Sequence, residues 1–268
     1  MKELRLTEIN IYPVKSLGGI SVLSSNAEQR GLQYDRRWMI VNEQNIFITQ
    51  RENPQMAMIG TRLDESGFEL YHKHFPENKI FIPLSISFGT PLKVRVWEDD
   101  CDALHWNEEA DNWLSTTLNM ACKLVYMPDT SNRFVDKKFA NNNEIVNFSD
   151  GYPFLIIGEE SLKDLNSKLE SPVPMNRFRP NFVFAGGNSF EEDEWTKFKI
   201  GDVIFKAVKP CGRCVITTIN QEDATQNKEP LKTLSKYRTS KNKVLFGQNL
   251  LTEKGGKISV GDKLILEG

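Results

Sequence analysis

The chain has 268 residues, and 34 Lys and Arg against 36 Asp and Glu give it a formal net charge of -2. This balance excludes a global basic field that would recruit nucleic acid. Hydrophobic residues make up 39% of the chain, which excludes disorder of the whole molecule. Apolar runs such as 154–157 are far shorter than the roughly 20 residues of a membrane span. Residues 1–8 lack a signal-peptide core, so we expect no membrane span and a cytoplasmic location.

The first hundred residues predict closely spaced strands. Residues 8–14 alternate apolar and polar positions until Pro13 interrupts the pattern. Residues 37–41 and 46–49 flank a short polar turn, which is typical of a hairpin. Further strands are predicted at 67–71, 79–82 and 92–97. Strands with no helix between them indicate an antiparallel sheet or a small barrel.

Three helices are predicted. Asn107 is a suitable N-cap for the first, because acidic residues follow it and one helical face carries Ala110, Trp113, Leu114 and Leu118. The second runs over 159–169, with leucines at helical spacing, and the third over 230–237, with proline at its opening.

The remaining sequence again predicts strands, with tight turns at 200–203 and 260–263 and a polar loop at 127–147. These strands are expected at 181–185, 198–208, 215–219, 244–251 and 257–266. We therefore expect a mainly β chain with some α (α+β). It divides into two closely packed β-rich domains, at 1–122 and 123–268.

Four cysteines are too few for a disulfide scaffold of this size, and the pair Cys211 and Cys214 needs its own explanation. Two cysteines three apart can chelate a metal or cycle as a dithiol. The β-branched run 215–218 favours a strand over the helix start of a thioredoxin-type motif. Structural zinc would need a second ligand pair, and the three histidines lie far away in sequence. If Cys211 and Cys214 were only small buried apolar residues, an arginine between them would not be required. The Arg213 guanidinium instead favours an anionic ligand near the sulfur atoms.

Three other segments place cations near polar or glycine residues. They are Pro13–Gly19, Tyr34–Trp38 and Arg177–Asn181, the last with two arginines on one side of an extended segment. Taken singly, each is more typical of a surface salt bridge than of a site. Together with Arg213 they would form a phosphate pocket.

Seven motifs in this order make the chain resemble the MOSC family, in the arrangement of a MOSC N-terminal β-barrel domain followed by a MOSC domain. The motifs are Tyr12-Pro13-Val14-Lys15-Ser16, Asp35-Arg36-Arg37-Trp38, Thr49-Gln50-Arg51, Phe178-Arg179-Pro180-Asn181, Cys211-Gly212-Arg213-Cys214, Glu229-Pro230-Leu231 and Phe246-Gly247-Gln248. The resemblance covers nearly the whole chain. It is strongest to the branch that reduces N-hydroxylated compounds, which includes amidoxime-reducing components and bacterial N-hydroxylated-base reductases.

The resemblance implies a molybdenum cofactor (molybdopterin) with Cys214 as the metal ligand and catalytic residue, and a structural role for Cys211. A soft thiolate suits a soft metal. The implied cofactor contacts are Lys15, Ser16, Arg36, Asp150, Gly151, Tyr152, Arg179, Asn181, Gly212, Arg213, Cys214 and Asn249. Two of these places depart from the family pattern. Residues 150–152 stand where some relatives have small hydroxyl residues, and Asn249 stands where some have tyrosine.

The resemblance further implies an oxidoreductase that reduces the N–O bond of small N-hydroxylated substrates such as amidoximes. The chain stops at Gly268 with no cysteine after Cys214. We therefore expect no Fe–S cluster in it and electrons from a separate ferredoxin, flavoprotein or cytochrome. The alternatives are a cofactor carrier or sulfur-delivery module without turnover, and a fold that has lost the cofactor. A pyridoxal phosphate function would come only by family association.

The acidic run at 190–195 has two interpretations. It is typical of a solvated loop anchored by its aromatic residues, and the alternative is a docking patch for the electron donor.

Overall fold

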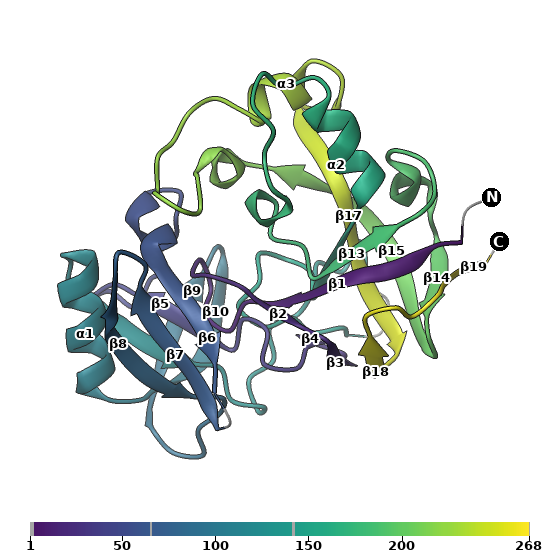
Figure 1. Ribbon diagram of the computed structural model, residues 1–268. Helices are drawn as coiled ribbons and strands as arrows, with labels where there is room; N and C mark the ends of the chain where they lie inside the picture. The colour runs from purple at the N-terminus through teal and green to yellow at the C-terminus, as the bar shows by residue number, and fades with distance from the viewer. Residues whose placement is uncertain (1–2, 65, 141–142, 268) are drawn as a thin grey trace.

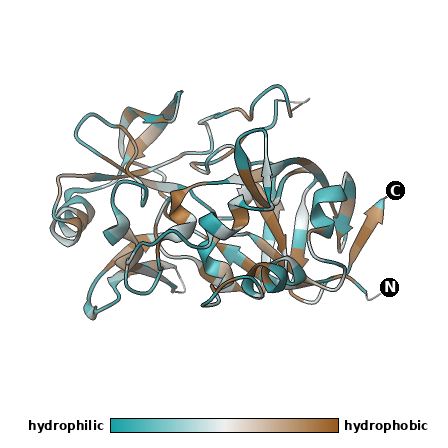
Figure 2. Ribbon diagram, turned by 90° about the horizontal axis from the view of Figure 1, so that it is seen from above, coloured by the Kyte–Doolittle hydropathy of each residue, from teal (hydrophilic) through white to brown (hydrophobic). Residues whose placement is uncertain are grey.

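The computed structural model describes residues 3–64, 66–140 and 143–267. Figure 1 shows a cluster of short strands with α1 at one end of the molecule and a larger sheet with α2 and α3 at the other. Figure 2 shows hydrophobic residues concentrated along the strands. The chain is mainly β, with three α-helices in the described residues, which confirms the expected fold class.

The strand cluster contains two antiparallel sheets, ordered β5-β11-β10-β9 and β6-β7-β8. Both contribute to one core, in which Trp38, Phe68 and Leu124 are fully buried. Three of the strands confirm the predictions at 67–71, 79–82 and 92–97. The bounds are β5 Trp38–Val41, β6 Ile59–Leu63, β7 Gly67–His72, β8 Phe75–Pro83, β9 Thr90–Val96, β10 Asp99–His105 and β11 Lys123–Tyr126.

Helix α1 (Glu108–Leu118) covers this core as predicted. The Asn107 side chain accepts a hydrogen bond from the Ala110 amide at 2.9 Å, which satisfies one of the free N–H groups of the first turn. Ala110, Leu114 and Leu118 of the predicted apolar face are buried, whereas Trp113 is only partly buried. Asn119 ends the helix in a left-handed conformation.

The larger sheet has the order β19-β14-β15-β17-β12-β13-β1-β2, and β16 pairs with β17. Its strands are antiparallel except for the β12–β13 pair, which is parallel. Phe154, Phe182 and Phe205 form the centre of its core. The bounds are β1 Arg5–Ile11, β2 Ile20–Val22, β12 Phe154–Gly158, β13 Phe182–Ala185, β14 Lys197–Ile200, β15 Val203–Arg213, β16 Thr239–Ser240, β17 Lys243–Lys254 and β19 Leu264–Glu267.

The two parts of the sequence interleave in space. β1 pairs with β13, and a small sheet joins β18 (Gly256–Ser259) to β3 (Ser24–Glu28) and β4 (Gly31–Leu32). N-terminal residues are therefore hydrogen-bonded to strands far along the chain. This interleaving brings residues 13–16 and Arg36 next to the larger sheet. The predicted domain boundary between residues 122 and 123 stays a prediction.

Two segments that were each predicted as one strand form two strands in the structure. The prediction at 198–208 is β14 and β15, which pair around the predicted turn, and that at 257–266 is β18 and β19. Residues 46–49 do reverse against β5, with the Ile48 amide donating to the Ile40 carbonyl at 2.9 Å, but they make only isolated bridges. Helix α2 (Glu159–Asn166) ends before the predicted 169, and α3 spans Leu231–Ser235.

The predicted strand at 215–219 is wrong. Residues Val215–Thr218 form a 3-10 helix, η4. The Thr217 hydroxyl donates to the Cys214 carbonyl at 3.0 Å, and the Thr218 hydroxyl donates to the Val215 carbonyl at 2.7 Å. These local side-chain bonds stabilise a turn and override the β preference of the sequence. The other 3-10 helices are η1 Pro54–Met58, η2 Met175–Arg177 and η3 Glu191–Glu194.

Candidate functional site

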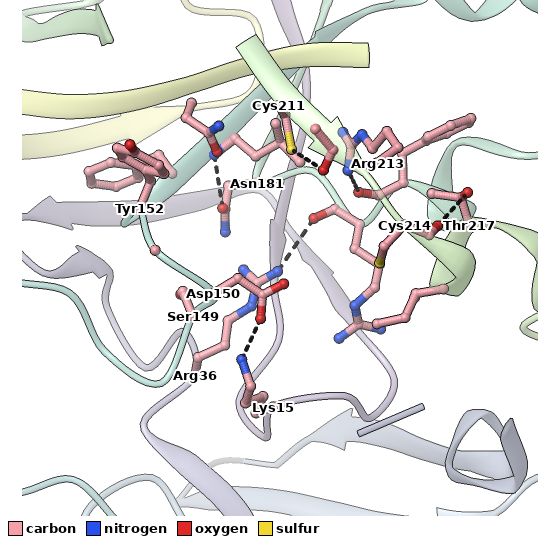
Figure 3. Close-up of a pocket in the computed structure, with 18 of the residues that line it drawn as sticks. Lys15, Arg36, Ser149, Asp150, Tyr152, Asn181, Cys211, Arg213, Cys214 and Thr217 are labelled. Atoms are coloured by element: carbon pink, nitrogen blue, oxygen red, sulfur yellow. Dashed lines mark hydrogen bonds and ion pairs between the residues drawn. The ribbon is translucent and has the colours of Figure 1, made fainter. Parts of the chain in front are cut away.

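A cavity of about 150 Å³ lies where the N-terminal segments meet the larger sheet. All twelve residues that the resemblance implied as cofactor contacts line it. They come from the segments after β1, before β5, before β12 and before β13, from the end of β15 with the residue that follows it, and from β17. Figure 3 shows labelled side chains from these segments around one space. Residues up to about 230 positions apart in sequence therefore share one site.

Cys214 lies between β15 and η4 and is partly exposed. Its extended backbone (φ -124°) ends the strand, and the bond from Thr217 to its carbonyl fixes the turn that follows. Cys211 also lines the cavity, from within β15. Burial raises the pKa of the Cys211 thiol, against the opposing effect of Arg213. The two sulfur atoms thus belong to one wall of the cavity (Figure 3).

Lys15 and Asp150 form an ion pair inside the site. The Lys15 Nζ donates to Asp150 Oδ1 at 2.7 Å (Figure 3). It also donates to the Phe148 carbonyl at 2.7 Å. Burial lowers the pKa of Lys15 to about 8, although Asp150 favours its charged form. Asp150 itself is about half exposed. Its partial burial opposes ionisation, but the charges of Lys15 and Arg51 outweigh this and hold the pKa of the carboxyl well below its usual range.

Arg51 is the residue that sequence reasoning missed as a site residue. Its Nη2 donates to Asp150 Oδ2 at 2.9 Å, and its guanidinium lies 4.5 Å from the centre of the Trp97 ring. Burial opposes its charge, but Asp150 and the Cys214 thiol raise the pKa of Arg51. The motif Thr49-Gln50-Arg51 was visible in the sequence, but nothing local in it points to a cysteine 163 positions away.

Arg36 and Arg179 share one aromatic ring. Their guanidinium carbons lie 4.1 Å and 4.3 Å from the centre of the Tyr12 ring. Arg36 also donates to Asp35 Oδ2 at 2.6 Å, and the Tyr12 hydroxyl donates to the Pro180 carbonyl at 3.1 Å. Burial lowers the pKa of Arg179 to about 10, so the guanidinium stays charged at neutral pH. Two arginines are thus held in place in spite of their mutual repulsion.

Three residues of the site adopt left-handed backbone conformations. The φ angles are +67° at Ser16, +47° at Arg36 and +54° at Arg179. Non-glycine residues pay a conformational cost there, of the order of 1 to 3 kcal/mol each, and such strain clusters at functional sites. The surrounding contacts therefore hold these loops in shapes that local preference alone would not select.

Arg213 donates from Nε to the Phe246 carbonyl at 2.8 Å and from Nη1 to the Phe178 carbonyl at 3.0 Å. Its buried Nη2 has no hydrogen-bond partner among the described residues. Buried charged donors without a partner are costly, so this atom marks a place for an acceptor. Gly212, next to it, is exposed.

The two predicted asparagines also support the framework. Asn181 donates to the Asn10 carbonyl at 3.1 Å and accepts from the Leu155 amide at 3.2 Å, which ties β1 to β12. Asn249 donates to the Lys209 carbonyl at 3.1 Å. Gly151 and Tyr152 line the cavity beside Asp150, and a Cβ at Gly151 would meet nothing within 4 Å.

Arg177 differs from its prediction. It ends η2 instead of lying on an extended segment, and its Nε donates to the Thr217 carbonyl at 2.9 Å. Arg177 therefore supports the turn after Cys214. Other residues that line the cavity but were not predicted as cofactor contacts are Ser149, Phe154, Leu155, Phe178, Ile216 and Thr217.

No helix of the described residues is long and apolar enough to cross a membrane. Within the same residues, no three His, Cys, Asp or Glu side chains gather as a metal-binding group.

The sequence is similar to known proteins over both parts of the chain. The mitochondrial amidoxime-reducing component 1 of Mus musculus is 33% identical over 98% of this chain and 82% of its own length. The protein of the same name from Xenopus laevis is 32% identical over 96% of this chain and 80% of its own. The molybdenum cofactor sulfurase of Oryza sativa subsp. japonica is 32% identical over 92% of this chain, but over only 32% of its own length.

Two family models match. The MOSC N-terminal beta barrel domain matches residues 3–121, and the MOSC domain matches residues 143–265. The two models, the full-length relatives and the arrangement of the site residues agree, and the chain belongs to the MOSC family.

Proposed function

We propose that this chain binds a molybdenum cofactor in the cavity and reduces the N–O bond of small N-hydroxylated compounds. The observation that carries the proposal is a partly exposed thiol, Cys214, in a cavity lined by five cations and one carboxylate. The cations are concentrated there although the whole chain has a net charge of -2. Such a field suits a ligand with several negative charges.

The residues fit this group. A pyranopterin dithiolene carries anionic sulfur and a terminal phosphate, and Arg213 Nη2 is a buried donor that lacks an acceptor among the described residues. Arg36 and Arg179 are held against Tyr12; Arg179 forms no ion pair with a described residue, and Arg36 is also paired with Asp35. A cysteine thiolate is the soft ligand that a soft metal prefers, and Cys214 offers it beside the Arg51 guanidinium.

Each residue then has a definite task. Cys214 would hold the metal, and Arg213, Arg179 and Arg36 would hold the anionic groups. Lys15 and Arg51, clamped on Asp150, would keep the loop at 149–152 closed over the ligand. When bound, the cofactor supplies two-electron redox chemistry that no side chain here can perform. The protein contributes orientation and a cationic, partly dry surrounding.

The overall reaction defines which reactants the site must receive. An amidoxime takes up two electrons and two protons, its N–O bond breaks, and an amidine and water leave. The electrons come from a separate carrier protein in this proposal. The relatives named as amidoxime-reducing components are 32–33% identical to this chain, and their names support the choice of substrate class.

The test combines loading with turnover. The chain is produced in a host that makes the cofactor, and molybdenum per chain is measured by elemental mass spectrometry. Benzamidoxime reduction is then followed with reduced methyl viologen as the donor. We expect close to one molybdenum per chain and one benzamidine for each two viologen radicals oxidised.

Two outcomes contradict the proposal in different ways. Molybdenum at this ratio without turnover would favour a cofactor carrier or sulfur-delivery module. A ratio near zero, in a host that loads a control molybdenum enzyme, would remove the cofactor assignment and the role given to Cys214.

A further inference from the structure

A second hollow lies on the other side of the strand that leads to Cys214. It is lined by Asp136, Lys138, Phe139, Val208, Lys209, Pro210, Ser240, Lys241, Lys243 and Leu245, and is called the lysine groove below. Four lysines and a single carboxylate give it a positive charge, in a chain whose net charge is -2. Lys138, Lys241 and Lys243 are exposed.

The lysines of the groove are not neutralised. No ion pair between described residues includes any of the four, whereas lysines elsewhere, such as Lys93, Lys163 and Lys263, lie within 2.7 Å of a carboxylate oxygen. Exposed cations cost little, but several together create a local field that attracts an acidic partner.

The groove and the cavity share a wall. Lys209 and Pro210 line the groove, and the next residues of β15, Cys211 and Gly212, line the cavity. The Lys209 ammonium lies 4.7 Å from the Phe139 ring centre and 5.7 Å from that of Tyr152, a cavity residue. A Cβ on Gly212 would lie 3.3 Å from Lys243 Cδ. A protein seated in the groove would thus be one strand away from the site.

The acidic run at 190–195 does not offer a comparable surface. Glu192 is fully buried and accepts hydrogen bonds from the Gly158 amide and the Ser161 hydroxyl. Asp193 pairs with Arg238. These carboxylates hold η3 against α2 and against Arg238, which precedes β16, so the solvated-loop interpretation is wrong for Glu192, and fewer carboxylates of this run are free for a partner than the sequence suggests.

We infer that the lysine groove is the docking surface for an acidic electron-carrier protein that delivers electrons to the site beyond β15. The inference rests on the proposed function, because only a reductase needs such a partner. The balance is simple: the carrier is oxidised, by one electron in each of two encounters, and the N-hydroxylated substrate takes up both electrons with two protons.

The test compares two double variants with the same change in charge. Lys138→Glu with Lys241→Glu alters the groove. Lys254→Glu with Lys257→Glu is the control, on exposed lysines, the first at the opposite end of β17. Benzamidoxime reduction is driven by reduced flavodoxin, plant-type ferredoxin or cytochrome b5, and separately by reduced methyl viologen. Affinity of each oxidised carrier is measured by surface plasmon resonance at several salt concentrations.

We expect kcat/KM for at least one carrier to fall about tenfold or more in the groove variant, because electrostatic steering is lost. The wild-type affinity should weaken with salt, and that of the groove variant should do so less. Methyl viologen turnover should equal wild type in both double variants, and the control should behave as wild type with the carriers.

The inference is overturned if the groove variant and the control respond equally to the carriers, or if viologen drives turnover and no carrier does. It is also overturned if the groove instead binds single-stranded DNA and the carrier kinetics stay unchanged. Failure of the proposed function would give a different result from failure of the docking inference. The wild-type protein would then show no turnover even with methyl viologen.

Discussion

The four cysteines lie in two regions that give the thiol opposite surroundings, an apolar core in one and a cavity rich in cations in the other. Cys101 and Cys122 are buried at the strand cluster near the N-terminus, Cys101 against Val94 and Val96. Burial raises the pKa of Cys101 to about 11, so it stays a neutral thiol. Cys211 and Cys214 are partly exposed beside arginines. In one region cysteine serves as a small apolar side chain, and in the other it lines a cavity rich in cations.

The cations of the two regions differ in the same way. In the strand cluster, Arg95 and Lys93 are exposed and pair with Asp100 and Asp102. In the cavity, Lys15 is almost completely buried, and Arg213 keeps an unsatisfied buried donor. Proteins tolerate buried charge poorly unless it is compensated. The cavity therefore resembles a site that is completed by an anion, whereas Arg95 and Lys93 of the strand cluster already have carboxylate partners.

The largest expected effect separates the two cysteine regions. Cys214→Ser should abolish benzamidoxime reduction, because a hydroxyl does not replace a thiolate on a soft metal. Cys101→Ser should retain the activity and lower the free energy of unfolding by about 1 to 3 kcal/mol, since it places a hydroxyl in an apolar core. Turnover and urea denaturation measure both. Wild-type activity in Cys214→Ser would remove this residue from the mechanism.

A smaller effect tests the orphaned donor. Arg213→Ala should weaken retention of the cofactor by about tenfold to hundredfold, the usual value of a hydrogen bond to a charged group. Arg95→Ala, in the strand cluster, is the control and should retain it fully. Molybdenum per chain after dialysis is the measurement. Equal retention in the two variants would mean that Arg213 only braces the Phe178 and Phe246 carbonyls.

The smallest effect concerns Lys15 and pH. Its pKa is about 8 in the folded protein and near 10.5 in the unfolded chain. Between these values the unfolded state binds more protons, so wild-type stability should rise with pH relative to Lys15→Met, by about 1 kcal/mol per pH unit at most. The difference should become constant only below about pH 7, where Lys15 is protonated in both states. The exposed Lys93→Met variant is the control, and denaturant titrations at pH 7 to 10.5 provide the measurement.

A flat difference between wild type and Lys15→Met across this range would show that burial does not lower the pKa of Lys15. The Lys15–Asp150 pair would then behave as an ordinary surface ion pair, like those of the strand cluster.

Local signals in the sequence were sufficient for several features. The cap at Asn107 and the apolar spacing after it predicted α1, because both act within one or two helical turns. Alternation predicted β7, β8 and β9 for the same reason. The motif resemblance assembled twelve residues that the structure places around one cavity, although periodicity alone could not have shown that they converge.

Other features depended on contacts between distant segments. Val215–Thr218 has β-branched residues, but hydroxyl bonds to nearby carbonyls and the Arg177 contact with Thr217 make it a 3-10 helix. Arg51 reaches Asp150 across 99 positions, and β1 pairs with β13 across the chain. Local preferences are worth a few tenths of a kcal/mol per residue, which tertiary contacts readily exceed.

By itself, the sequence determined the mainly β class, the capped helix α1, the family and twelve of the residues that line the cavity. Only the tertiary structure decided that Arg51 faces Cys214, that Arg213 keeps a free donor, and that four lysines gather behind β15. The physical reason is the range of the interactions. Caps and periodicity act between near neighbours in the chain, whereas burial and charge depend on which distant segments the fold brings together.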